Sequence, residues 1–231
     1  KQKDLDLDGD IDFSNMKVYE HSMAQSVMQA VETYLEATGQ KFKDLKPAAT
    51  PNLDDHQIPP EDFKEKGELE EEASKLVLKN LYTARLVRCD TLWTVNSLAR
   101  QVRKWNRACD KRLKRLMEYL YHTHNYVQMC WVGDDLDKCQ LAQFVDASFA
   151  GDLQDSHSMN GSFLAIIGPN TFVPICWMCK KQTAVSHSSS EAEVISLDAG
   201  IRMDGIAALS LWDIVLDLSL IHISEPTRPL H

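Results

Sequence analysis

Two acidic residues, Asp146 and Glu191, occupy positions from which carboxylates could meet around a divalent cation. Asp146 ends an apolar run that is typical of a strand, and Glu191 follows the hydroxyl group of Ser188 at the start of a helical pattern. A strand-end carboxylate and one in the first turn of a helix packed on that strand can converge on Mg²⁺, as two-metal phosphoryl transfer requires. The alternative is structural, because an acid in the first turn of a helix also complements the helix dipole.

A cluster of cations offers a second kind of chemistry. From Arg85 to Arg115 the chain has ten Lys or Arg and only two acids, a local charge of +8 in a protein of net charge −9. Cationic side chains along one helical face suit the phosphate backbone of a nucleic acid. The residues expected to make such contacts are Arg103, Lys104, Arg107, Lys111, Arg112, Lys114 and Arg115. The alternative is a solvated helix face without a ligand.

Three further patterns have structural explanations. Residues 4–15 begin like a calcium-binding EF-hand loop, but Asn15 stands where such a loop carries its bidentate Glu. Cys176 and Cys179 have the spacing of half a zinc site, yet alternation along a strand would point them to opposite faces. Adjacent Ser186 and His187 form a polar turn more simply than they form a hydrolase site. We therefore expect no calcium, zinc or hydrolase chemistry here.

Hydrophobic periodicity predicts the elements that would position these residues. Helical spacing recurs over residues 23–35, 69–84, 92–102 and 113–121, strands are predicted at 127–132, 139–145, 161–167 and 172–179, and a last helix runs from about 188 to 216. Residues 46–66 contain four prolines among acids and predict an extended connector. We expect the stripe of the last helix to pack on the sheet through Ile195, Leu197, Ile201, Ile206, Leu209, Trp212 and Val215. The order of elements indicates an α+β fold.

Composition narrows the class of protein. The chain has 231 residues, of which 44% are hydrophobic and 26% are charged, which excludes collagen-like and wholly disordered chains. No run of about 18 apolar residues predicts a membrane span. Six cysteines without a secretory signal indicate reduced thiols, so we expect an intracellular protein, cytoplasmic or nuclear, and not a secreted one. The chain does not begin with Met, which suggests a fragment.

Two sequence blocks carry a family resemblance. The blocks FVDASFAGDLQDSHSMNGSF (residues 144–163) and CWMCKKQTAVSHSSSEAEVISL (residues 176–197) resemble the paired signatures of the ribonuclease H domain in copia-type LTR-retrotransposon Pol polyproteins. Upstream, LKNLYTARLVRCDTLWTVNSLAR (residues 78–100) and KRLKRLMEYLYHT (residues 111–123) are similar to the segment between reverse-transcriptase palm and ribonuclease H in the same polyproteins. The resemblance covers about residues 67–216. The Tyr-x-Asp-Asp motif of reverse transcriptases is not present.

The resemblance implies a helical reverse-transcriptase thumb or connection remnant, followed by an incomplete ribonuclease H-like mixed sheet with its first helix. In the family, acids hold two Mg²⁺ ions that hydrolyse the RNA strand of an RNA–DNA hybrid. Asp146 and Glu191 match two of those catalytic metal-binding acids, and the motif of the next acid is absent. We therefore expect a catalytically incomplete chain. The alternatives are a non-catalytic nucleic-acid-binding remnant and a pseudogene product.

The same resemblance predicts the organisation and the partners of the chain. Residues 1–66 are unassigned, 67–126 are thumb- or connection-like, 127–217 are a truncated ribonuclease H-like domain, and 218–231 are an expected artefact. The last assignment rests on LSLIHISEPTR (residues 218–228), which matches the translation of a transposase mosaic-end sequencing adapter. The expected partners are an RNA–DNA hybrid or another nucleic acid, and the remainder of the Pol polyprotein. No membrane and no small-molecule substrate are predicted.

Overall fold

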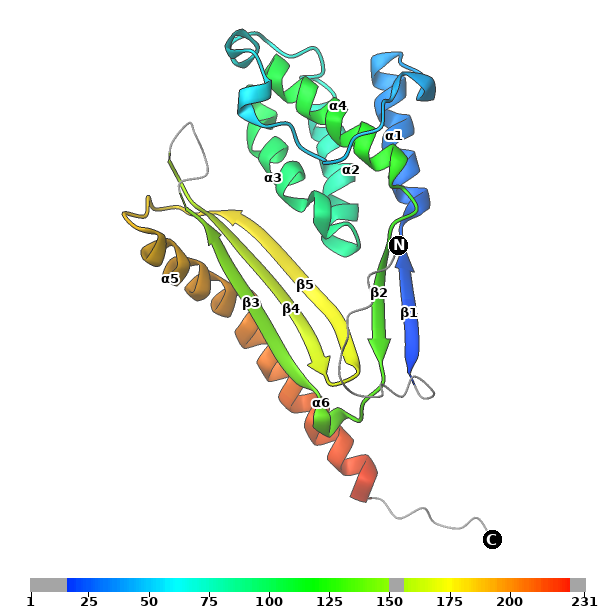
Figure 1. Ribbon diagram of the computed structural model, residues 1–231, viewed down its shortest axis with the longest axis vertical. Helices are drawn as coiled ribbons and strands as arrows, with labels where there is room; N and C mark the ends of the chain where they lie inside the picture. Colours follow the sequence, from blue (N-terminus) through cyan, green and yellow to red (C-terminus); the bar gives the residue numbers. More distant parts are fainter. Residues whose placement is uncertain (1–15, 150–155, 225–231) are drawn as a thin grey trace.

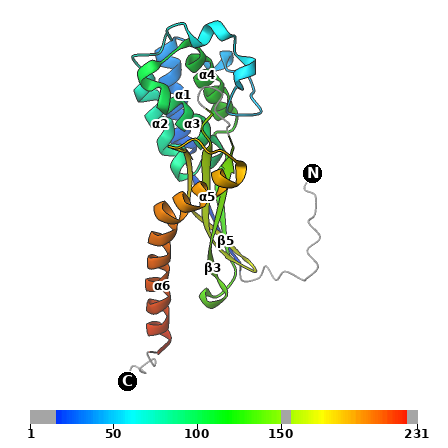
Figure 2. The same cartoon turned by 90° about the vertical axis from the view of Figure 1, so that its left-hand side faces the viewer.

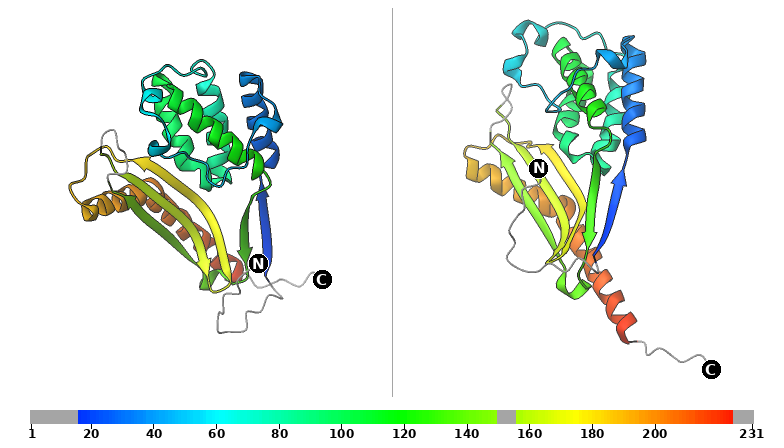
Figure 3. Two further views of the ribbon diagram at one scale, coloured as in Figure 1. Left: turned by 45° about the horizontal axis from the view of Figure 1, so that its top comes forward. Right: turned by 45° about the vertical axis from the view of Figure 1, so that its right-hand side comes forward.

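The protein folds into a helical layer, a five-stranded sheet and a long C-terminal helix (Figure 1). The computed structural model describes residues 16–149 and 156–224. Helices α1 to α4 gather at one end of the sheet, and α5 and α6 run along the sheet face that is turned away from them, as both views of Figure 3 show. The predicted α+β class is confirmed.

The helical layer contains the main hydrophobic core. Its helices are α1 (Ala24–Thr38), α2 (Ala73–Leu86), α3 (Leu92–Gln101) and α4 (Arg107–His122). The buried cluster is drawn from these helices and their connections, and of the described sheet residues Trp177 and Cys179 pack against it. In α4 the predicted stripe is confirmed, since Leu113, Leu116 and Leu120 are all buried.

The sheet has the order β1–β2–β5–β4–β3, and every pairing is antiparallel. The strands are β1 (Lys17–Ser22), β2 (Val127–Val132), β3 (Gln140–Ser148), β4 (Met159–Gly168) and β5 (Thr171–Lys181). The predicted mixed sheet is therefore wrong. Two residues join β4 to β5 and ten join β3 to β4, and both links are shorter than the crossover of about a dozen residues or more that a parallel pair needs.

Strand β1 is an element that the sequence did not predict. It pairs with β2 along its whole length, from Lys17 opposite Val132 to Ser22 opposite Val127. All six of its residues are exposed, so the sequence has no alternation of buried and exposed residues that would predict this strand. Its partner β2 joins the rest of the sheet through one residue pair, Trp131 with Phe172. The β1–β2 ribbon consequently splays away from the other three strands (Figure 1).

The C-terminal helical segment packs on the sheet through small residues. Helix α5 (Ser189–Gly200) begins at the predicted Ser188 cap, whose Oγ accepts a hydrogen bond from the Glu191 N–H at 3.1 Å. A π-helical turn (Ile201–Gly205) then leads into α6 (Ile206–Ser224). The residues of α5 that are buried are Ala192, Ser196 and Gly200. An added Cβ at Gly200 would lie 3.1 Å from Val145, so close packing needs glycine there.

The predicted packing stripe of the last helix is wrong at four of its seven positions, whereas Ile195, Trp212 and Val215 are partly buried. Leu197, Ile201, Ile206 and Leu209 are exposed instead of facing the sheet. The predicted end near residue 216 is also wrong, because α6 continues to Ser224 and runs on past the sheet (Figure 2). Residues 218–224 of the expected artefact are thus helical, and 225–231 lie outside the described residues. Within the part of the chain that the structure describes, no helix is long and apolar enough to cross a membrane.

Candidate functional site

Asp146 lies near the end of β3, on the sheet face that is turned toward the helical layer. Side chains alternate along a strand, and the neighbouring Val145 faces α5, where it lies against Gly200. Two residues before Asp146, Phe144 is paired with Phe163, which stacks on Trp177 at 6.1 Å. The indole N–H of Trp177 donates to a carbonyl oxygen of α2 at 2.8 Å. Asp146 is therefore placed on the aromatic face of the sheet, where it is exposed.

Glu191 lies in the first turn of α5, the helix that covers the opposite face. Its carboxylate accepts a hydrogen bond from the backbone N–H of His187, the residue before the Ser188 cap, at 2.7 Å. The helix contacts β3 more directly through Ser196, whose hydroxyl donates to the Asp146 carbonyl oxygen at 2.7 Å. The backbone of Asp146 is thus held by α5, while its side chain belongs to the other face.

Among the described residues, Asp146 and Glu191 make up only part of the ligand set that a magnesium ion needs. Asp146 and Glu191 supply two carboxylates from different faces of the sheet, and the part of the chain that is described holds no group of three or more His, Cys, Asp or Glu side chains that could bind a metal ion. Mg²⁺ requires near-octahedral coordination by hard oxygen ligands. The assignment of Asp146 and Glu191 to a metal site stays a prediction.

The cationic residues are positioned by α4 and by the short 3-10 helix before it (Val102–Lys104). Asn106 caps α4, since its side-chain oxygen accepts from the Cys109 N–H at 2.9 Å. Beyond the cap, apolar residues recur at helical spacing on the inner side, which leaves the cations to the outer side. Arg107, Lys111 and Arg115 follow one another at intervals of four residues and so form one row along the helix.

Residues 50–65, named here the acid strap, cover this row. Glu65 pairs with Arg107 at 2.6 Å, and Asp62 pairs with both Arg107, at 3.5 Å, and Lys111. The remaining contacts are an ion pair of Asp55 with Arg112 and a hydrogen bond of 2.9 Å from Arg115 to the Thr50 carbonyl oxygen. The strap runs antiparallel to α4, because Glu65 contacts Arg107 near the start of the helix and Thr50 contacts Arg115 further along it (Figure 1).

The strap is fixed to α4 through backbone contacts as well as charges. Arg107 N–H donates to the Glu65 carbonyl oxygen at 3.0 Å, and the Asn106 amide donates to that of Phe63 at 3.3 Å. Ile58 of the strap is buried. The hydrogen bond and charge of Glu65 raise the pKa of Arg107, with a further contribution from Asp62. Sequence reasoning missed this partnership, although an acidic, proline-containing connector in a chain with one basic helix is a usable signal.

Not all of the predicted cations face solvent. Arg112 is buried, and its guanidinium lies over the Phe63 ring at 5.6 Å as well as against Asp55. The interpretation of Arg112 as part of a solvated face is wrong, because the strap closes over it. Arg103 and Lys104 are exposed, Lys114 is partly exposed, and none of the three makes an ion pair with another described residue.

The cysteine pair and the Ser-His turn have structural surroundings. Cys176 and Cys179 lie on opposite faces of β5. Burial raises the pKa of both thiols. The charge of Asp204, on the α5–α6 side, raises the pKa of Cys176, and the charge of Arg100, on α3, lowers the pKa of Cys179. The hydroxyl group of Ser186 donates to the buried Gln182 at 2.6 Å, so it has a structural partner. The calcium-like residues 4–15 lie outside the described residues.

Comparisons with known proteins support a retrotransposon relation. The chain is 32% identical over 121 residues to the retrovirus-related Pol polyprotein from transposon RE1 of Arabidopsis thaliana. The chain is similar to part of a retrotransposon Pol polyprotein. A second polyprotein, from transposon RE2 of the same plant, is also 32% identical, over 126 residues. Each alignment covers 52% of this chain and 8% of the relative, so the chain spans a small part of the polyproteins it matches. No family model and no solved structure matches.

Proposed function

We propose that this chain is a nucleic-acid-holding piece of a retrotransposon-type Pol polyprotein, and that it binds an RNA–DNA hybrid through α4 and the turn before it. The observation that carries the proposal is the local charge of +8 over residues 85–115 in a chain of net charge −9. The similarity to Pol polyproteins makes nucleic acid, together with the remainder of such a polyprotein, the natural partner.

The contacts to phosphate would come first from the cations that the strap leaves accessible. Arg103, Lys104 and Lys114 make no ion pair with another described residue, and Arg107 and Lys111 keep 52% and 40% of their side-chain surface exposed. Cations that neutralise phosphates release condensed counterions, which drives binding at low salt. Arg112 is excluded from this role because it is buried beneath the strap.

Hybrid cleavage is not part of the proposal for this chain alone. Magnesium would supply activated water and charge stabilisation if a complete set of acids held it. Asp146 and Glu191 provide only two carboxylates, on different faces, and Glu191 is already engaged by the His187 N–H. We therefore propose that the chain binds an RNA–DNA hybrid without hydrolysing its RNA strand. Any catalytic role would need acids from outside the described residues.

Binding is tested by fluorescence anisotropy of a 12-base-pair RNA–DNA hybrid in a series of salt concentrations. Replacing Arg103, Lys104 and Lys114 with Gln should reduce the log–log salt slope by about 0.9 for each phosphate that these cations no longer neutralise. A matched variant with Lys43, Lys75 and Lys138 changed to Gln removes the same charge elsewhere and should keep the slope. Equal slopes for the two triple variants would overturn the proposed interface.

Cleavage is tested on the same hybrid with Mg²⁺ and with Mn²⁺. The wild-type chain and the Asp146→Asn variant should both leave the RNA strand intact. Metal-dependent cleavage by the wild type that the Asp146→Asn change abolishes would show that the chain has a working site and would contradict the non-catalytic proposal.

A further inference from the structure

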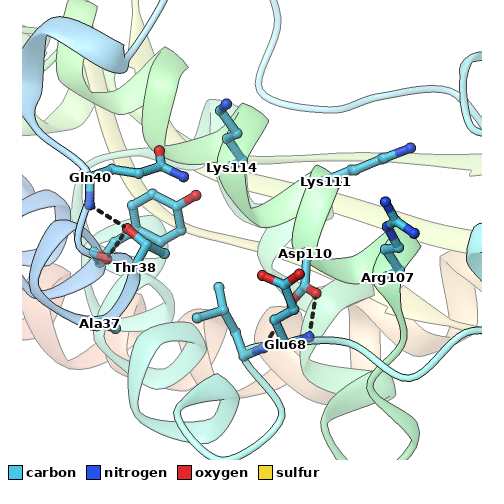
Figure 4. A pocket seen from close by; sticks show the side chains of 10 residues that line it. Ala37, Thr38, Gln40, Glu68, Arg107, Asp110, Lys111 and Lys114 are labelled. Atoms are coloured by element: carbon cyan, nitrogen blue, oxygen red, sulfur yellow. Dashed lines mark hydrogen bonds between the residues drawn. The ribbon is translucent and has the colours of Figure 1, made fainter.

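A pocket of 290 Å³ lies between α1 and α4, beside the cations that the acid strap holds. Arg107, Lys111 and Lys114 line it from α4, and Thr38 and Gln40 line it from the end of α1 and the turn that follows. Figure 4 shows the three cationic side chains rising from α4, with Gln40 across from Lys114. The strap carboxylates of Asp62 and Glu65 pair with two of these cations but are not among the residues that line the pocket.

The pocket lining has three cations, Arg107, Lys111 and Lys114, and two acids, Glu68 and Asp110. Asp110 is fully engaged, because its carboxylate accepts from the Glu68 N–H at 2.7 Å, the Leu69 N–H at 3.2 Å and the Trp105 indole at 2.6 Å. Glu68 is the second acid, and it is exposed at the rim. Arg107 and Lys111 are already paired with Asp62 and Glu65 of the strap, so Lys114 is the lining cation that offers an anionic ligand a free charge.

The hydroxyl group of Tyr34 adds a neutral polar group to the pocket wall. Burial raises the pKa of Tyr34, and the carboxylates of Glu118 and Asp110 raise it further. The hydroxyl therefore stays protonated and can donate a hydrogen bond. Together with the ammonium groups of α4, it gives the pocket donors for an oxyanion.

We propose that this pocket binds a phosphate group through Lys114 and Arg107, and that the carboxylate of Glu65 competes with phosphate for Arg107. The inference rests on the proposed nucleic-acid function and deepens it, because a backbone phosphate of the hybrid is one source of the ligand and a free polyphosphate is another. Lys114 makes no ion pair with another described residue, so it can receive phosphate without displacing a carboxylate.

The ion pair between Arg107 and Glu65 is weak enough for phosphate to replace the carboxylate. Arg107 and Glu65 have 52% and 51% of their side-chain surfaces exposed, and ion pairs at such positions stabilise a protein only slightly. A phosphate presents more negative charge than a carboxylate and accepts paired hydrogen bonds from Arg. Asp62 is deeply buried and is expected to keep its place, so Glu65 is the carboxylate that phosphate displaces.

The test uses the full chain and inorganic pyrophosphate, with binding followed by calorimetry at low salt. Lys114→Gln should weaken binding by about tenfold, because it removes a charged hydrogen-bond donor. Glu65→Gln should strengthen binding by about two- to fivefold, because an exposed competing ion pair is removed. The controls Lys138→Gln and Glu72→Gln make the same charge changes outside the pocket and should change the affinity by less than about twofold.

The outcomes separate this inference from the proposed function. If neither Lys114→Gln nor Glu65→Gln changes pyrophosphate affinity relative to its control, the phosphate pocket is wrong, even if the hybrid binds through Arg103 and Lys104. If pyrophosphate binds as expected but hybrid does not, the pocket stands as a site for free polyphosphate and the nucleic-acid function fails. Unchanged thermal midpoints of the Lys114→Gln and Glu65→Gln variants would exclude unfolding as the cause of either result.

Discussion

Helices α4 and α5 leave opposite kinds of side chain on their outer faces. The outer face of α4 is cationic, and the acid strap covers most of it with carboxylates from the same chain. The outer face of α5 and the start of α6 exposes apolar side chains, among them Leu197, Ile201 and Leu209, beside the Arg202–Asp198 ion pair, while small residues face the sheet. The helical layer therefore pairs part of its own charge and leaves Arg103, Lys104 and Lys114 accessible, whereas the C-terminal helix leaves apolar side chains exposed.

This contrast indicates where the stability of the molecule resides. The buried cluster is helical, and α4 contributes Leu113, Leu116 and Leu120 to it. The sheet is attached to that cluster chiefly at Trp177 and Cys179. We infer that changes in the helical layer should cost much more free energy of unfolding than equal changes on α5. Substitutions in the two regions test this difference.

The largest effect is expected at Leu113, which is completely buried in α4. Leu113→Ala removes packed methyl groups and leaves a cavity, so the free energy of unfolding should fall by about 2–5 kcal/mol. Urea unfolding followed by circular dichroism measures this decrease. A decrease below about 1 kcal/mol would show that the helical cluster is not the main core.

The joint between the sheet and the helices should show an intermediate effect. Trp177→Phe keeps an aromatic ring on the sheet but removes the donor to the Ala84 carbonyl oxygen, which leaves that oxygen without its partner. The expected cost is about 1–3 kcal/mol. The matched control Phe144→Leu alters an exposed ring on the same face and should cost less. Equal losses of unfolding free energy in the two variants would show that the Trp177 hydrogen bond does not stabilise the contact between sheet and helices.

Tyr119 should make stability depend on pH at high pH. Burial, followed by its hydrogen bond to Asp90, raises the pKa of Tyr119 from 10.0 to about 12. The folded state therefore holds the proton more tightly than the unfolded state, so this contribution is fully present below pH 10 and is lost as the pH rises toward about 12. The effect is on the order of 1 kcal/mol. The difference in urea midpoint between wild type and Tyr119→Phe should shrink over this range, and a constant difference would contradict the assignment.

The smallest effect is expected on the outer face of α5. Leu197 is about half exposed, so Leu197→Gln should change the free energy of unfolding by no more than about 0.5 kcal/mol. The inward control, Ser196→Leu, places a large side chain where the helix lies against β3 and should be strongly destabilising. A large destabilisation by Leu197→Gln would show that this face is buried in the folded protein.

Sequence patterns predicted the local elements well and the long-range contacts poorly. The cap at Ser188 and the stripe of α4 follow from neighbouring residues, and both are confirmed. Strand β1 has no alternating pattern, because pairing with β2 and not burial defines it. The orientation of α5 was missed because hydrophobicity alone gives a stripe and does not say which side faces the sheet.

The same limit applies to the candidate site. The cations could be found from composition, but their partners in the strap lie some 40 to 65 residues away along the chain. Helical spacing placed Arg112 with the other cations, and only the contact with Asp55 shows that it is buried. Strand alternation places Asp146 on the face away from α5, a relation that its sequence motif does not contain.

Hydrogen–deuterium exchange of the full chain, with and without a 12-base-pair RNA–DNA hybrid at low salt, tests the central claim most directly. We predict slower exchange over residues 102–115, faster exchange over residues 60–67 as Glu65 releases Arg107, and no change over residues 189–209. Protection confined to α5 and the strands around Asp146, with residues 102–115 unaffected, would contradict the claim that the basic surface of the helical layer holds the nucleic acid.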